Sequence, residues 1–218
     1  MIHGFEECTG STVPGGVSLR SMRHLVVAGS VFLVLAAGTP AATQETPTVR
    51  VRIDTAYGAI DVEIDTARAP RTSANFLRYV DDGYYDGGQF HRTVTMDNQP
   101  DNDVRIEVIQ ASIDASRREA QYPPIALERT TVSGLRHIDG AISMARSGPD
   151  TATSSFFICV GDQPSLDFGG DRNPDGQGFA AFGRVVAGME IVRTIQHQPA
   201  EGQQLTPRVR IDRVSRLP

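Results

Sequence analysis

The sequence predicts a mainly β fold in which a sheet closes into a barrel and helices cover its ends. Three observations lead to this class: about seven or eight short strand-like segments, only about two helix-like segments, and long polar connections between them. Strands and helices do not alternate regularly, which disfavours a doubly wound parallel sheet.

The first predicted unit is strand, strand, helix. Apolar and polar residues alternate over 49–53 and again over 60–64, as in half-buried strands. Tyr57-Gly58 between these segments suits a turn, so we expect an antiparallel hairpin. Pro70 then suits the first turn of a helix, and Gly83 suits its end.

The later elements are separated by loops rich in Ser, Gly, Pro and Asp. Residues 93–140 mix polar stretches with apolar pieces at 104–109 and 125–127, and we interpret them as strand and long loop. The remaining predicted elements are strands at 141–145, 156–160 and 179–185, a helix at 189–195, and a closing strand around 209–214.

The N-terminal part has the pattern of an export signal. Arg20 and Arg23 precede the apolar stretch 25–38, which is shorter than the roughly 20 residues that a spanning helix needs. We therefore predict a signal peptide over residues 1–42, a linker over 43–48 and a folded domain over 49–217. Met22 is a second candidate for the initiator, and an uncleaved membrane anchor is the alternative to cleavage. The expected location is periplasmic or extracellular, with no membrane segment in the mature domain.

Composition excludes several classes of function. The 21 Lys and Arg residues are scattered among 26 Asp and Glu residues, and the net charge is -5, so no basic face predicts nucleic-acid binding. Cys159 lies in an apolar run and is expected to be a buried, inert thiol, because reactive thiols need exposed, electropositive surroundings. Cleavage would remove Cys8, which leaves no intrachain disulfide.

Metal and hydrolase sites are not expected either. The five His residues have no metal-ligand spacing, and no Gly-x-Ser-x-Gly run is present. Residues 171–176 match the start of a calcium loop, but Phe182 occupies the twelfth position, where a Glu belongs. We interpret this segment as a solvated turn.

Several motifs, in this order and spacing, resemble the cyclophilin family and in particular its exported bacterial members. They are Ala69-Pro70, Asn75-Phe76, Gly83-Tyr84-Tyr85, Phe90-His91-Arg92, Gly140 to Ala145, Ser154 to Ile158, and Phe182 to Met189. The resemblance implies a closed eight-stranded antiparallel barrel capped by two α-helices, with a proline-binding groove on its outer face. It also implies a monomeric peptidyl-prolyl cis/trans isomerase that needs no cofactor and acts on proline-containing polypeptides.

The chemistry of this reaction agrees with a single arginine at its centre. Rotation about an X-Pro bond is opposed by an amide barrier of about 18 to 20 kcal/mol, and no nucleophile or metal is required to lower it. A dry pocket and a donor to the pyramidal prolyl nitrogen are sufficient. The resemblance assigns this donor to Arg92, whereas strand alternation is expected to turn His91 away.

The resemblance also assigns the residues that line the proline pocket. Phe157 would form its aromatic floor, while Phe156 would point into the barrel core. The other substrate-binding residues expected are Gln110, which would steady Arg92, Val108 and Leu166 in the pocket wall, Phe179 in place of a family His, Ser155 in place of a family Gln, and the rim Ala145, Arg146 and Ser147.

Some expected groove residues are replaced in this chain. Ser155 is too short to reach the backbone atoms that a Gln would bind, and Glu107 or another residue of a longer loop stands where the family has an aromatic. We therefore expect activity that is weaker or differently selective. The alternatives are a proline-peptide binding or chaperone module without turnover, and a structural barrel without a groove.

Overall fold

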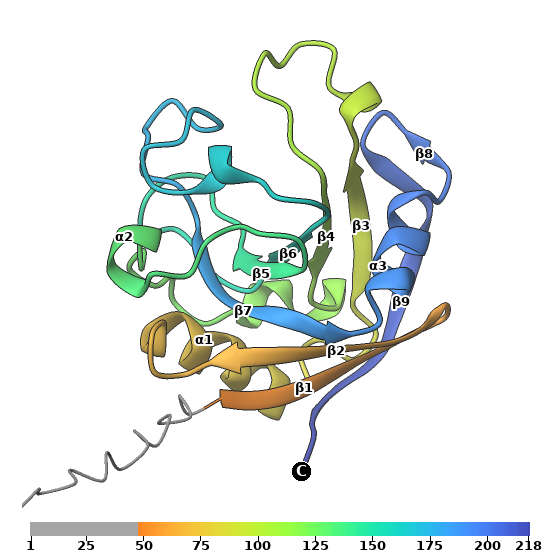
Figure 1. Ribbon diagram of the computed structural model, residues 1–218. Helices are drawn as coiled ribbons and strands as arrows, with labels where there is room; N and C mark the ends of the chain where they lie inside the picture. Colours follow the sequence, from red (N-terminus) through yellow and green to blue (C-terminus); the bar gives the residue numbers. More distant parts are fainter. Residues whose placement is uncertain (1–47) are drawn as a thin grey trace, which may run out of the picture. The chain divides into compact units, whose positions relative to one another are not determined.

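The computed structural model describes residues 48–218, and the proposed signal peptide lies outside the described residues, as do 43–47 of the expected linker. Nine strands form one sheet (Figure 1). They are β1 (Thr48–Thr55), β2 (Gly58–Asp65), β3 (Gln89–Val94), β4 (Val108–Ser112), β5 (Ala141–Met144), β6 (Phe156–Cys159), β7 (Ala180–Ala187), β8 (Ala200–Glu201) and β9 (Gln204–Arg216).

The sheet closes into a barrel of eight antiparallel strands. The strand order is β1-β2-β7-β5-β6-β4-β3-β9-β8, and β1 also pairs with β9. The two-residue β8 pairs only with β9 and stands outside the closed ring. The predicted fold class is confirmed, and closure leaves no long unpaired edge on the eight main strands.

Two helices pack against the barrel, as predicted, and the structure has a third, short helix that was not predicted. Helix α1 (Pro70–Asp81) contacts β2, β7 and β9, whereas α3 (Met189–Gln196) contacts β2, β3 and β4. The missed helix α2 (Thr130–Ser133) has a single turn and ends at Gly134 with φ 70°. Its sequence is too short to show a helical period.

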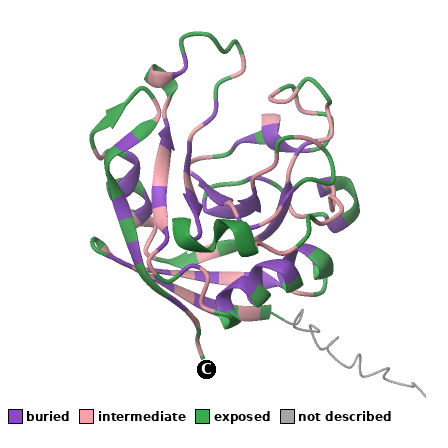
Figure 2. Cartoon of the chain, turned by 180° about the vertical axis from the view of Figure 1, so that it is seen from behind, coloured by how far each residue is buried: buried purple, intermediate pink, exposed green. Residues whose placement is uncertain are grey.

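Buried and exposed residues alternate along the strands and helices, as the colours of Figure 2 show for α1. Phe156 is fully buried and joins an aromatic core in which its ring lies 5.5 Å from that of Phe76. The next residue, Phe157, belongs to a second apolar cluster that also contains Val108, Cys159 and Leu166. The predicted division between Phe156 and Phe157 is confirmed, as is the burial of Cys159.

The first hairpin turns one residue earlier than predicted. Thr55 pairs with Gly58, so the turn consists of Ala56 and Tyr57, and Gly58 begins β2. Gly58 has φ +130°, and a Cβ there would lie 2.9 Å from Cδ1 of Ile191 on α3. Glycine at this position therefore serves the close approach of α3 as well as the turn.

A register shift in β3 changes the expected direction of its side chains. The pairing of β3 with both neighbouring strands shifts between Phe90 and Arg92. Phe90 lies in the barrel core, whereas Arg92 lines an outer cavity, so strict alternation does not hold across His91. Our reason for turning His91 away from Arg92 was wrong, because the extra residue of a bulge breaks the period of two.

In the part of the chain from residue 48 onward, no helix is long and apolar enough to cross a membrane.

Candidate active site

Arg92 lies on β3 and is held by two glutamine side chains. Its Nη1 donates to Oε1 of Gln110 on the neighbouring strand β4, at 3.0 Å. Its Nε and Nη2 both donate to Oε1 of Gln203, at 2.9 Å and 2.5 Å. Gln203 in turn donates from Nε2 to the backbone oxygen of Asn98, at 3.1 Å. These contacts fix the plane of the guanidinium.

The Arg92 guanidinium keeps donors for a ligand. It has five N–H groups, and three hydrogen bonds are made to the two glutamines, which leaves two N–H groups without a partner in residues 48–218. Burial lowers the pKa of Arg92, and the positive charge of Arg172 acts in the same direction. Since both glutamine acceptors are neutral, the charge of Arg92 is not cancelled by a carboxylate in that part of the chain.

Arg92 borders a cavity of about 210 Å³ on the outer face of the barrel. Phe157 is 5% exposed and contributes an aromatic ring to this cavity, with the Phe179 ring edge-on at 5.3 Å. The cavity is lined by Arg92, Ile106, Val108, Gln110, Ala145, Arg146, Phe157, Leu166, Arg172, Asn173 and Phe179. A small apolar recess beside a charged donor suits a ring attached to a polar backbone.

Most of the residues expected from the sequence meet at this cavity, but two do not. Ser147 is exposed, and its backbone N–H donates to Oγ1 of Thr151 at 3.1 Å. Ser155 is half-buried, and its backbone oxygen accepts a hydrogen bond from the N–H of Ala145 at 2.9 Å. Neither Ser147 nor Ser155 is among the residues that line the cavity, and their expected part in substrate binding stays a prediction.

The loop before β4 supplies an aliphatic residue to the cavity, where Glu107 or another residue of this loop was expected to replace the family's aromatic. Ile106 is 6% exposed and lines the cavity. Glu107 is not among the lining residues, and its carboxylate accepts a hydrogen bond from Nε2 of Gln196, at 3.4 Å. Ile106 is an apolar residue between the charged residues Arg105 and Glu107, and this pattern could have indicated that its side chain is buried. The length of the loop prevented its alignment with the family from the sequence.

Three further residues at the site were missed from the sequence. Gln203 lies 111 positions from Arg92 in the chain, and Arg172 and Asn173 belong to a loop that was interpreted as a solvated turn. No local periodicity marks such residues, because their position depends on the order in which strands pair.

A buried polar chain lies behind the aromatic wall of the cavity. The ring of His137 is stacked against that of Phe157 at a centroid distance of 5.9 Å. Its Nδ1 lies 2.8 Å from Oδ1 of Asp167, and its Nε2 lies 2.9 Å from Oγ of Ser143. Burial tends to raise the pKa of Asp167, but hydrogen bonds from His137 outweigh it and the pKa is lowered.

The order serine, histidine, aspartate is that of a hydrolytic triad, but the hydroxyl here is inaccessible. Ser143 is 0% exposed and His137 is 1% exposed. A nucleophile must contact its substrate, so we interpret this chain as internal support for the Phe157 ring.

The segment with calcium-loop spacing is tied to the cavity rim. Arg146 donates from Nη1 and Nη2 to the two carboxylate oxygens of Asp175, at 2.7 Å and 2.9 Å. This contact lowers the pKa of Asp175 from 3.8 to about 2. Within residues 48–218 no cluster of three or more His, Cys, Asp or Glu side chains could hold a metal.

His91 adjoins Arg92 in the chain but is not among the residues that line the cavity. Its Nδ1 is buried without a hydrogen-bond partner in the described part of the chain. Burial lowers the pKa of His91. Nothing in this arrangement directs its ring toward a substrate in the cavity.

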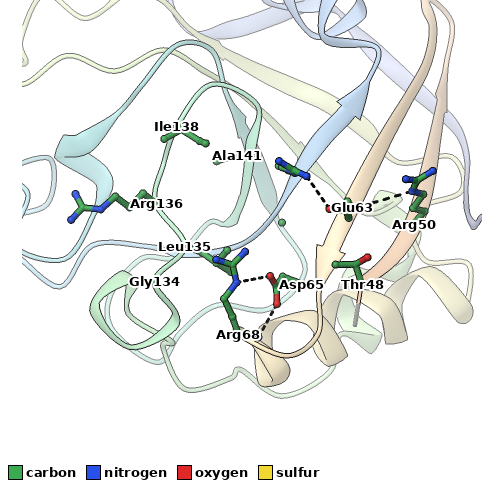
Figure 3. A pocket seen from close by; sticks show the side chains of 12 residues that line it. Thr48, Arg50, Glu63, Asp65, Arg68, Gly134, Leu135, Arg136, Ile138 and Ala141 are labelled. Carbon is green, nitrogen blue, oxygen red and sulfur yellow. Dashed lines mark hydrogen bonds and ion pairs between the residues drawn. The ribbon is translucent and has the colours of Figure 1, made fainter. Parts of the chain in front are cut away.

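A larger cavity of about 640 Å³ lies elsewhere, over β1, β2, β7 and the segment 134–141 (Figure 3). Two carboxylates face it, and both are paired: Asp65 with Arg68 at 2.6 Å, and Glu63 with Arg184 at 3.3 Å and with Arg50 at 3.9 Å. It has no aromatic residue in its lining. We place the candidate site in the smaller cavity, because of these two cavities only the smaller one combines an aromatic wall with a half-buried donor that has no carboxylate partner in residues 48–218.

The chain resembles known proteins over most of its length. The family model described as "Cyclophilin type peptidyl-prolyl cis-trans isomerase/CLD" matches residues 48–216. The chain is 36% identical to peptidyl-prolyl cis-trans isomerase A of Dickeya dadantii, over 82% of this chain and 87% of the relative. It is 33% identical to peptidyl-prolyl cis-trans isomerase B of Escherichia coli, over 67% and 83% respectively.

A solved structure of a cyclophilin type protein has the same fold as this chain. The crystal structure of a cyclophilin type peptidyl-prolyl cis-trans isomerase of Cryptosporidium parvum superposes with a TM-score of 0.63, at 22% identity, over 79% of this chain and 99% of that one.

Proposed function

The chain belongs to the cyclophilin type peptidyl-prolyl cis-trans isomerase family, and from this membership we propose that its isomerase activity resides in the cavity between Arg92 and Phe157. The single observation that carries the proposal is geometric. A half-buried cationic donor with two N–H groups that have no partner in residues 48–218 borders the same 210 Å³ recess as the Phe157 ring. The substrates are polypeptides that contain proline.

The proposed mechanism begins with binding of the proline ring. Phe157, Val108 and Leu166 are all at most 5% exposed and provide the apolar wall of the 210 Å³ cavity. Burying the ring there removes water from the X-Pro bond. Electrostatic interactions with Arg92 become stronger as a result, because the local dielectric falls.

The rate increase comes from Arg92. As the bond rotates, amide resonance is lost and the lone pair of the prolyl nitrogen becomes localised on that atom, where a guanidinium N–H can donate to it. Gln110 and Gln203 hold the guanidinium in place before the substrate arrives, so little reorganisation is needed. Lowering the barrier by about 7 kcal/mol would accelerate rotation roughly 10⁵-fold.

The test is Arg92→Ala in a peptide isomerisation assay followed by NMR exchange. We expect kcat/KM to fall about 10²- to 10³-fold, as for other preorganised donors. The control is Arg213→Ala, an exposed arginine on β9 outside the cavity lining, for which kcat/KM should stay at the original value.

Two results would overturn the assignment. Full catalysis by Arg92→Ala would remove Arg92 from the mechanism. If the unaltered protein binds proline peptides without accelerating rotation, the domain is a binding module instead. Ser155 supplies no side-chain contact to the cavity, so we expect a kcat/KM below that of a relative with a longer polar residue there.

We also propose that the domain is exported after cleavage near residue 42, as a monomer. The support is the charged and then apolar pattern of the N-terminal sequence. N-terminal sequencing of the protein from a cell fraction tests this, and an intact N-terminus in the cytoplasmic fraction would contradict it.

A further inference from the structure

The loop over residues 167–178 forms one side of the candidate site. Arg172 and Asn173 line the cavity together with Arg92 and Phe157. This is the segment whose spacing resembles a calcium loop, so its composition alone gives no reason to place it against the site. Its position therefore makes it a candidate for selecting substrates.

Several contacts fix the loop in this position. Arg172 donates from Nη1 to the backbone oxygen of Val104 at 2.7 Å. Arg146 binds both oxygens of Asp175, and its Nε donates to the backbone oxygen of Gly178 at 2.8 Å. Gly178 has φ +63°, and a Cβ there would lie 2.5 Å from the backbone of Asp167. The loop is thus built against the rim and is not a loosely held connection.

The loop changes the charge of the site. Three arginines line the cavity, and no Asp or Glu is among its lining residues. Arg146 is neutralised by Asp175, but Arg92 and Arg172 have no carboxylate within 4.0 Å anywhere in residues 48–218. Burial lowers the pKa of Arg172, as it does that of Arg92, which is typical of cations held without a partner.

We propose that Arg172 makes this pocket select proline residues that are flanked by a carboxylate, that is, an Asp or Glu next to the proline in the substrate chain. A substrate carboxylate would supply the anion that the Arg172 guanidinium lacks, while Arg92 keeps its free N–H groups for the prolyl nitrogen. The inference rests on the proposed isomerase site and adds the class of substrate that the site prefers. It explains how a groove with fewer polar contacts from Ser155 can still bind a substrate.

The experiment measures kcat/KM for matched proline peptides with Glu, Gln or Lys on either side of the proline. For the unaltered protein we expect the Glu peptide to exceed the Gln peptide about fivefold on at least one side, and the Lys peptide to be the poorest. The preference should shrink at high salt, because the charges are partly exposed.

For each variant we compare the kcat/KM of the Glu peptide with that of the Gln peptide. Arg172→Gln should reduce this ratio to about one, and Arg172→Lys should retain part of it, because the charge remains. The matched control Arg213→Gln removes the same charge from an exposed position on β9 outside the cavity lining and should keep the full ratio.

The outcomes separate this inference from the function on which it rests. If no peptide is isomerised, the proposed site function fails. If the Gln and Glu peptides are isomerised equally well, or if the preference survives in Arg172→Gln, the isomerase assignment stands and the charge selection is overturned.

Discussion

At the scale of single residues, the pocket depends on side chains that a substrate never touches. His137 contacts the back of Phe157 and is held between Asp167 and Ser143. All three polar groups are buried, and each hydrogen bond replaces one that would be made to water in the unfolded chain. The position of the aromatic floor is therefore coupled to a polar network inside the domain.

Ser143→Ala should destabilise the domain by about 1 to 3 kcal/mol, because the buried Nε2 of His137 loses its partner. Denaturant unfolding measures this. The control is Ser165→Ala, a half-buried serine for which no side-chain hydrogen bond is found in the described part of the chain. The control should change the free energy of unfolding by less than about 0.5 kcal/mol, and equal losses in both variants would contradict the prediction.

At the scale of elements, the barrel depends on the close approach of neighbouring strands. Gly183 on β7 pairs with Ile64 on β2, and a Cβ at Gly183 would lie 2.3 Å from the backbone oxygen of Glu63. Neither strand can move aside without disturbing its other neighbour, since β1 and β5 pair with their opposite edges. Because the barrel is closed, relieving this clash would also disturb the pairing of β2 with β1 and of β7 with β5.

Gly183→Ala should lower the free energy of unfolding by about 1 to 3 kcal/mol through this overpacking. Gly148→Ala is the matched control, because a Cβ there meets no atom within 4 Å and the φ of Gly148 is not in the left-handed region. Urea midpoints of the two variants provide the comparison. A Gly183→Ala protein as stable as the control would show that β2 and β7 separate without cost.

At the scale of the whole molecule, buried or paired carboxylates link stability to pH. The pKa of Asp61 is lowered by its hydrogen bond from Arg52, that of Asp175 falls from 3.8 to about 2 beside Arg146, and that of Asp167 is lowered by His137 despite burial. A depressed pKa in the folded state means that the charged form is favoured by folding.

The stability contributed by these groups is present above about pH 4 and is lost as the pH falls toward about 2, through the folded pKa values. Thermal unfolding midpoints across this range should therefore decrease. Asp175→Asn should flatten part of the decrease, because its group no longer titrates. A midpoint that stays level or rises below pH 4 would contradict the assignment of these pairs.

The order of the elements could be predicted from the sequence because it depends on local chemistry. Alternation of apolar residues located β1 and β2, and Pro70 and Gly83 marked the limits of α1 within two residues. Motif order then indicated the family, and with it Arg92 and Phe157. The errors at Tyr57-Gly58 and His91 arose where a turn and a bulge shift the period by one residue.

The sequence by itself determined the first hairpin, the later strands near 141–145, 156–160, 179–185 and 209–214, and which arginine and phenylalanine are candidates for the site; β3, β4 and β8 were not located from it. Only the tertiary structure decided what surrounds them. Gln203 reaches Arg92 from 111 positions away, Arg172 arrives on a long loop, and Ser147 and Ser155 are left out. The physical reason is that strand pairing and barrel closure bring these groups together, and neither is encoded in a local pattern.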